Sequence, residues 1–223
     1  MLTIPCGKNY FVFIKTGKTA GSSMVEYLSK YLEIVWFKDL RRKRKKQLFN
    51  KLIIVTMDQV LFFQDEFPDI YEDSFTFGIV RNPYDRFVSG YLFHPFCRDF
   101  SMTEILSKLP TPPILPKYVR WKEDYPKKMW ELFSAYNHIS QPQSDPLIND
   151  LRFPINKLLK FEKIEGEVLR LTEDLSIGNP SQFPHIKKNT NRSHYSKYFN
   201  KDSVKLINKY FRSDFLFFDY EFL

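Results

Sequence analysis

The segment Lys15-Thr16-Gly17-Lys18-Thr19-Ala20-Gly21-Ser22-Ser23, hereafter the 15–23 loop, combines the groups that bind a phosphate. It offers two lysines, four hydroxyl side chains and two glycines, which let the backbone approach a ligand closely. The loop lies between an apolar run and a helical pattern, so its end is a helix N-terminus, where unpaired N–H groups and the helix dipole attract anions. We therefore expect an anion site here, with a merely tight strand-to-helix turn as the alternative.

Three residues of this loop, Gly17-Lys18-Thr19, match the last positions of the nucleotide P-loop pattern G-x-x-x-x-G-K-[ST]. That pattern requires a glycine at position 12, where the chain has Val12 inside an apolar run. The loop is therefore not a Walker loop. A nucleotide-dependent small-molecule kinase is kept as an alternative because it would share the same fold.

A second set of polar residues also follows an apolar run, in the order Arg81-Asn82-Pro83-Tyr84-Asp85-Arg86-Phe87-Val88-Ser89. Arg81 leaves the end of an expected strand, and Ser89 lies about two helical turns further on. If the turn folds back, the guanidinium and the hydroxyl can bind one phosphate together. A surface arginine and an ordinary helical serine are the alternative.

These two segments need strands to position them. The runs 10–14, 52–55, 75–80 and 158–161 are short, apolar and rich in strand-forming residues, and helical patterns alternate with them. Such alternation predicts an α/β fold, here P-loop-like, with a mainly parallel sheet flanked by helices.

The helix after the 15–23 loop is expected to begin with a capping box formed by Ser23 and Glu26. Its apolar face holds residues at helical spacing: Met24, Tyr27, Leu28, Tyr31, Leu32 and Val35. Further helices are expected from Pro83 onward and at 129–137, 166–175 and 203–211, whereas 216–218 is an apolar terminal segment. A proline-rich surface insertion at about 109–126 could border a binding cleft.

The bulk composition fits one domain, 1–223, because the chain has 223 residues and its 43% hydrophobic content suffices for a packed core. The formal charge is +8, and six consecutive cations point either to an anionic partner or to a solvated surface: Arg41, Arg42, Lys43, Arg44, Lys45 and Lys46. Two cysteines form neither a disulfide framework nor a metal set. With no bilayer-spanning run and no signal peptide in view, we expect a soluble, cytoplasmic protein that has no nucleic-acid partner.

The 15–23 loop, with Phe13 and Ile14 before it, resembles the 5′-phosphosulfate loop of sulfotransferases that use 3′-phosphoadenosine 5′-phosphosulfate (PAPS). That loop is written F-I-H-x-P-K-T-A-G-T-S in the carbohydrate branch, which is Golgi-type and family 2-like. The stretch 77–91 is similar to the 3′-phosphate motif of the same family, F-x-x-V-R-[ND]-P-x-[DE]-R-x-x-S-x-[YW]. Similarity continues at Gln141-Pro142-Gln143, at Phe161-Glu162-Lys163-Ile164, at 191–198 and at 214–220, so it covers nearly the whole chain.

The resemblance implies transfer of a sulfuryl group from PAPS to a hydroxyl on a carbohydrate, with release of 3′-phosphoadenosine 5′-phosphate (PAP) and without a metal. It assigns Lys18 to the bridging oxygen of the donor and the other residues of the 15–23 loop to its 5′-phosphate. Arg81 and Ser89 would bind the 3′-phosphate, and Arg192, with Lys187 or Lys188, is a further candidate. The six cations would contact an acidic glycan. A Golgi lumen location is the alternative if the sequence is part of a longer chain, and a non-catalytic module that binds PAP or another polyanion is the alternative function.

The chain departs from the family at two histidines. Lys15 stands where relatives often carry His, and Ile53-Ile54-Val55-Thr56 replaces a segment like K-H-A-T. An acceptor hydroxyl must lose a proton as it attacks, so a general base is still expected. His138 is the first candidate because it ends a predicted helix just before Gln141, and His94 and Asp58 are the others.

Overall fold

The computed structural model describes residues 7–94, 97, 100–108, 141–148, 155–177, 183 and 192–223, with the side chains of Arg41, Lys45, Asp58 and Pro146 outside the description. The chain divides into two compact units, which are described separately. Unit 1 comprises Met1–Arg81 and Gln143–Thr190, and unit 2 comprises Asn82–Pro142 and Asn191–Leu223. The expectation of one domain over 1–223 stays a prediction.

Unit 1 is built on a five-stranded parallel sheet in the order β2-β3-β1-β4-β5. Its strands are β1 (Tyr10–Lys15), β2 (Ile34–Trp36), β3 (Leu52–Thr56), β4 (Ser74–Val80) and β5 (Lys157–Lys160). All four ladders are parallel, which confirms the predicted α/β class and the four predicted strands. The central strand β1 has β3 on one side and β4 on the other, and in such sheets ligands bind at the carboxyl ends of the strands where the strand order reverses.

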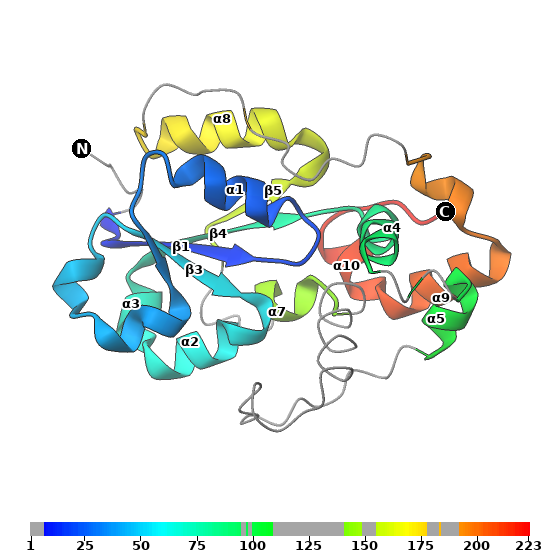
Figure 1. Ribbon diagram of the computed structural model, residues 1–223, viewed down its shortest axis with the longest axis horizontal. Helices are drawn as coiled ribbons and strands as arrows, with labels where there is room; N and C mark the ends of the chain where they lie inside the picture. Colours follow the sequence, from blue (N-terminus) through cyan, green and yellow to red (C-terminus); the bar gives the residue numbers. More distant parts are fainter. Residues whose placement is uncertain are drawn as a thin grey trace. The chain divides into compact units, whose positions relative to one another are not determined.

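Helices cover both faces of this sheet (Figure 1). One face carries α1 (Gly21–Leu28) and α8 (Ile164–Asp174), and the other carries α2 (Val60–Glu66), α3 (Pro68–Glu72) and α7 (Ser144–Ile148). Alternate strand residues pack into the first face, where the rings of Phe11 and Phe13 stack on Phe77 at centroid distances of 4.9 and 4.8 Å. Burial of both faces explains why the strands are continuous apolar runs rather than alternating ones.

The start of α1 differs from the sequence prediction. The helix begins at Gly21 rather than at Ser23, and its N-cap residue Ala20 is left-handed and forms no side-chain cap. Ser23 and Glu26 both lie inside the helix, so the predicted capping box is wrong. The left-handed backbone of Ala20 directs the chain into the helix without a side-chain cap. The capping-box pattern describes side chains only, so it does not predict such a start.

The end of α1 also differs, because the helix stops at Leu28 and Val35 belongs to strand β2. Leu32 still packs into the same apolar cluster as α1, but from the segment between the helix and β2. The helical spacing of apolar residues therefore continued past the real helix end. Periodicity alone does not separate a long helix from a helix, a turn and a strand that are all buried.

Between β2 and β4 the structure contains short elements that the sequence did not predict. The 3₁₀ helices η2 (Phe37–Arg42), η3 (Lys45–Leu48) and η4 (Met57–Gln59) precede α2 and α3. The predicted strand 158–161 and helix 166–175 are confirmed, with observed bounds Lys157–Lys160 and Ile164–Asp174. The 3₁₀ helix η6 (Phe161–Lys163) joins these two elements.

Unit 2 contains α4 (Pro83–Phe93), α5 (Met102–Lys108), η7 (Tyr195–Tyr198), α9 (Lys201–Tyr210) and α10 (Arg212–Phe217). Its aromatic core centres on Tyr84, whose hydroxyl contacts the Asn208 side chain and accepts a hydrogen bond from the Leu223 N–H at 2.9 Å. Burial raises the pKa of Tyr84, and it raises the pKa of the Cys97 thiol to about 11, so this cysteine is protonated at neutral pH. The apolar segment 216–218 lies at the end of α10, where Phe218 is buried while Leu216 and Phe217 are exposed.

Two expected features fall outside the described residues: the proline-rich insertion at about 109–126 and the helix at 129–137. Among the described residues, no helix is both long enough and apolar enough to cross a bilayer.

Candidate functional site

The 15–23 loop is tied to the sheet by two buried threonines. Thr16 Oγ1 donates to the Ile79 carbonyl at 2.6 Å, and the Thr19 hydroxyl lies 2.6 Å from Thr16 Oγ1 and 3.1 Å from the Thr16 carbonyl. The Gly17 N–H points to the Met57 sulfur at 3.4 Å. Both threonine hydroxyls are therefore used inside the protein, where they join the loop after β1 to the end of β4.

The loop backbone takes the left-handed region at two residues that are not glycine. Lys18 and Ala20 both have φ 63°. Such residues are held by their surroundings, because the left-handed region is disfavoured for side chains with a Cβ. Turns of this kind point successive N–H groups into a concavity that suits an anion.

Gly21, the first residue of α1, is covered by the Lys15 side chain. A Cβ at position 21 would lie 2.8 Å from Lys15 Cγ, which is closer than real contacts allow. Glycine is therefore needed there while the Lys15 stem crosses the helix start. No side-chain cap is formed at Ala20, and the N-terminus of a helix carries a positive partial charge of the kind that attracts phosphates.

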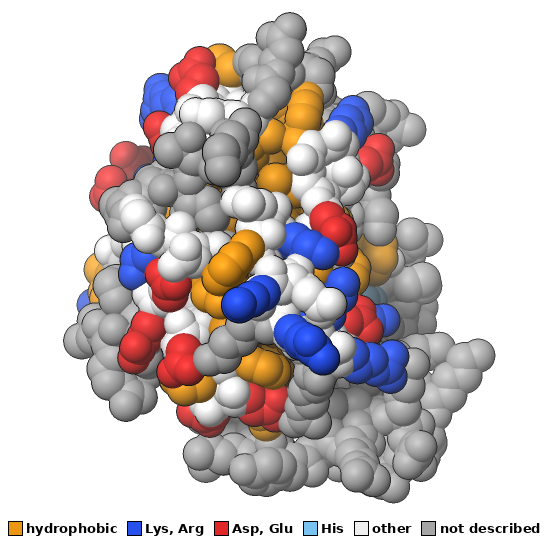
Figure 2. All heavy atoms as spheres, turned by 90° about the vertical axis from the view of Figure 1, so that its left-hand side faces the viewer, with side chains coloured by type: hydrophobic (Ala, Val, Ile, Leu, Met, Phe, Trp, Pro, Cys, Tyr) orange, Lys and Arg blue, Asp and Glu red, His pale blue; other side chains and the backbone are white. Residues whose placement is uncertain are grey.

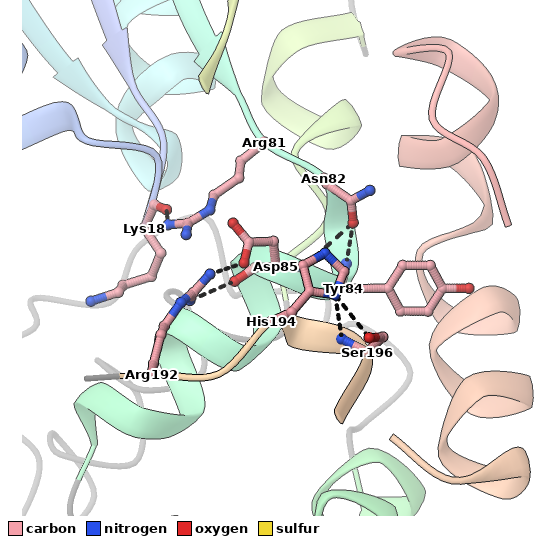
Figure 3. Close-up of polar contacts among 8 residues, drawn as sticks. All are labelled: Lys18, Arg81, Asn82, Tyr84, Asp85, Arg192, His194 and Ser196. Carbon is pink, nitrogen blue, oxygen red and sulfur yellow. Dashed lines mark hydrogen bonds and ion pairs between the residues drawn. The ribbon is translucent and has the colours of Figure 1, made fainter. Parts of the chain in front are cut away.

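Arg81 follows the last residue of β4 and reaches the 15–23 loop. Its guanidinium donates to the Lys18 carbonyl at 2.9 Å, and its Cζ lies 4.0 Å from the centroid of the Phe161 ring (Figure 3). The backbone of Arg81 is bound by the Gln143 side chain: the Arg81 N–H donates to Oε1 at 2.9 Å, and Nε2 donates to the Arg81 carbonyl at 2.8 Å. Within unit 1, the two segments singled out in the sequence therefore meet at Lys18 and Arg81.

The Lys18 side chain itself is directed away from this contact. Figure 3 shows the carbonyl of Lys18 turned toward Arg81 while the ammonium group points the other way. Lys18 is half-buried. Its backbone carbonyl is therefore the group that contacts Arg81, and its ammonium group lies elsewhere.

In unit 2, the remainder of the second segment forms the start of α4. The Asn82 side chain caps the helix by accepting from the N–H groups of Tyr84 and Asp85 at 3.0 and 3.4 Å. Asp85 forms an ion pair with Arg192, whose guanidinium also donates to the Asp85 carbonyl at 3.5 Å (Figure 3). Ser89 is half-buried on the same helix. Arg192 is therefore held by a carboxylate, and its role as a phosphate ligand stays a prediction.

Comparison with protein-family models gives one result that spans almost the entire chain: residues 3–221 match the model described as the sulfotransferase family. The chain belongs to the sulfotransferase family. A solved structure with the same fold, a sulfotransferase from Alicyclobacillus acidocaldarius, superposes with a TM-score of 0.52 at 15% identity, covering 96% of this chain and 97% of that one. No curated protein sequence is similar enough to this chain to count as a match.

The candidate bases of this sulfotransferase differ in how far the structure describes them. His94 is 7% exposed and caps the end of α4. Asp58 lies in η4 with its side chain outside the described atoms, and His138 lies outside the described residues altogether, as do Lys187 and Lys188. The identity of the general base stays a prediction.

The segment 41–46 of the sulfotransferase lies between two buried leucines. Leu40 and Leu48 are each 1% exposed, whereas Arg42, Arg44 and Lys46 between them are exposed. Lys43 is half-buried, and its Nζ forms an ion pair with Glu33 Oε1 at 3.5 Å. A hydrogen bond from Lys51, followed by the charges of Lys51 and Lys43, lowers the pKa of Glu33.

A space-filling view shows the charges on one face of the molecule. Several Lys and Arg side chains lie near the middle of the face drawn in Figure 2, with acidic and apolar side chains around them. This face therefore carries charges of both signs.

In the sequence, Gln143 and Phe161 belong only to the weaker family similarities, and neither has a predicted role. Gln143 directly precedes α7, and a single glutamine in a sequence gives no signal of its contacts. Only the fold brings these residues to Arg81.

Proposed function

We propose that this sulfotransferase moves a sulfuryl group from PAPS to a hydroxyl on a carbohydrate and releases PAP. The observation that carries the proposal is the contact between Arg81 and the Lys18 carbonyl. Family resemblance assigns Arg81 to the donor's 3′-phosphate and the 15–23 loop to its 5′-phosphosulfate. The contact joins these two parts. ATP has no 3′-phosphate, so an arginine in this position favours PAPS over a kinase donor.

In the proposed reaction the acceptor oxygen forms a bond to sulfur while the bond from sulfur to the bridging oxygen breaks. The electron pair of that bond leaves with PAP, and the acceptor proton passes to a base among His138, His94 and Asp58. Lys18 places its ammonium beside the bridging oxygen, where negative charge grows, and fixed charges aimed at such a position stabilise a transition state. The backbone of the 15–23 loop holds the 5′-phosphate, and Arg81 with Ser89 binds the 3′-phosphate.

The carbohydrate acceptor rests on resemblance to the carbohydrate branch of the family and on the cations at 41–46. Arg42, Arg44 and Lys46 are exposed on a short segment, as an acidic glycan would require. Transfer from labelled PAPS across a panel of neutral and acidic glycans would identify the acceptor.

PAP is expected to raise the melting temperature much more than ADP. A ligand that binds only the folded chain stabilises it by linkage, and at one hundred times Kd the shift for a chain of this size is about 5–10 °C. ADP lacks the 3′-phosphate and should give less than half that shift at equal concentration. Differential scanning fluorimetry with PAP, ADP and ATP measures this, and equal shifts for PAP and ADP would contradict the role given to Arg81 and Ser89.

Replacing Arg42, Arg44 and Lys46 together by glutamine is expected to raise KM for an acidic glycan by about 3–150-fold at low salt, since exposed charge pairs contribute a few tenths to one kcal/mol each. The effect should shrink at high salt, because ions screen exposed charges. The triple change Lys201, Lys205 and Lys209 to glutamine is a matched control, with the same change in charge on α9 of unit 2. Equal KM changes in both variants would mean that the segment 41–46 is ordinary solvated surface that does not contact the acceptor.

A further inference from the structure

We propose that Gln143 and Phe161 are positioning residues that fix Arg81 against the 15–23 loop, so that recognition of the donor's 3′-phosphate is coupled to the conformation of the loop that carries Lys18. The inference rests on the proposed function for the identity of the donor. Its structural part concerns unit 1 alone and is open to a test without any donor.

Gln143 acts on Arg81 as a substitute strand partner. The parallel ladder between β4 and β5 ends at the pair Val80 and Lys160, so the next residue, Arg81, has left the sheet. One side-chain amide then binds both the N–H and the carbonyl of Arg81, at 2.9 and 2.8 Å, and Gln143 is fully buried. Because an amide is both donor and acceptor, it satisfies both backbone groups and fixes the direction in which Arg81 leaves the strand.

Phe161 acts on the side chain of Arg81. It follows β5 directly, in η6, and its ring lies 4.0 Å from the guanidinium carbon. A cation over an aromatic face is attracted to it, and a planar guanidinium also stacks there, which limits its orientations. Backbone and guanidinium of Arg81 are thus fixed by two different residues.

The fixed guanidinium in turn restrains Lys18. It donates to the carbonyl of a residue at φ 63°, a conformation that the chain does not favour on its own. A charged donor makes this bond stronger than one between neutral groups. If Arg81 loses its fixed position, the 15–23 loop should relax at Lys18, and the ammonium group should lose its set direction.

The experiment compares Gln143→Leu, which keeps the side-chain volume but removes both polar atoms, with Gln64→Leu, a change at another buried glutamine of unit 1 located on α2. A second pair, Phe161→Leu and Phe161→Tyr, removes or keeps the aromatic face. The first measurement is hydrogen exchange of peptides covering 15–23 in the unliganded protein. The second is the ratio of Kd for ADP to Kd for PAP.

Gln143→Leu and Phe161→Leu are expected to speed exchange in the 15–23 loop about tenfold and to lower the ADP-to-PAP ratio about tenfold, as the loss of buried hydrogen bonds or of a cation–π contact implies. Gln64→Leu and Phe161→Tyr should leave both readouts within about twofold, within the scatter of such contributions. Unchanged exchange in Gln143→Leu and Phe161→Leu would overturn the inference, even if PAP still binds selectively. If the wild type binds PAP no better than ADP, the proposed function fails instead, and the exchange data still decide whether Arg81 restrains the loop. Should Gln143→Leu fail to fold, the Phe161 pair carries the test alone.

Discussion

Replacing Lys18 by alanine is expected to slow sulfuryl transfer by about 10²–10³-fold, the loss typical of removing one electrostatic stabiliser of a transition state. The charge on the bridging oxygen grows as its bond to sulfur breaks, so the ammonium group acts mainly on the reaction and less on binding. PAP affinity should therefore fall much less than the rate. Single-turnover transfer from labelled PAPS, at saturating donor, measures the rate beside a PAP titration.

Two further variants separate the charge of Lys18 from its geometry. Lys18→Arg should restore little, because a planar guanidinium does not replace a compact ammonium charge. Lys30→Ala, an exposed lysine in the same unit, should leave the rate unchanged. If Lys18→Ala transfers at the wild-type rate once saturated with donor, Lys18 is only a binding residue.

Replacing Arg81 by alanine is expected to weaken PAP binding by about 10²-fold, since hydrogen bonds to charged groups contribute about 1.5–3 kcal/mol each. ADP binding should weaken by only a few-fold, through loss of the bond to the Lys18 carbonyl. Arg81→Lys should rescue poorly, because lysine supplies a point charge without the flat fork that lies over Phe161. Isothermal titration calorimetry with both nucleotides gives the comparison.

The matched control is Arg170→Ala, which removes an exposed arginine from α8 of unit 1. Its affinities for PAP and ADP should both equal those of the wild type. An equal loss of PAP and ADP affinity in Arg81→Ala would mean that the residue holds the loop but does not read the 3′-phosphate.

The sheet and the 15–23 loop could be predicted because their signals are local. Strands such as 52–55 are apolar over their whole length, and the loop concentrates glycines, hydroxyls and lysines between a strand and a helix. The end of α1 could not be placed, because Leu32 and Val35 are both buried at helical spacing without belonging to the helix. Helices α2 and α3 have seven and five residues, too short for periodicity to establish them.

The contacts around Arg81 could not be predicted, for a different reason. Gln143 is 62 residues away in sequence and Lys18 is 63 residues away, and only the parallel arrangement of β1, β4 and β5 brings their segments together. Motif spacing identifies Arg81 as a candidate ligand but contains no information on what holds it. The identity of the general base could not be predicted for a related reason. Which of His138, His94 and Asp58 acts as the base depends on tertiary placement and not on the local sequence pattern.

The left-handed backbone at Lys18 and Ala20 bears on the evolution of stability in this protein. Conformational strain kept at a functional loop is balanced by favourable contacts elsewhere in the fold, so the unliganded protein is less stable than its core alone would allow. Selection for activity keeps this backbone geometry in spite of its cost, and Ala20→Gly should lower the cost without changing the geometry, because glycine adopts positive φ freely. Lineages in which catalysis is no longer required should therefore lose this backbone geometry before they lose the apolar sheet beneath it.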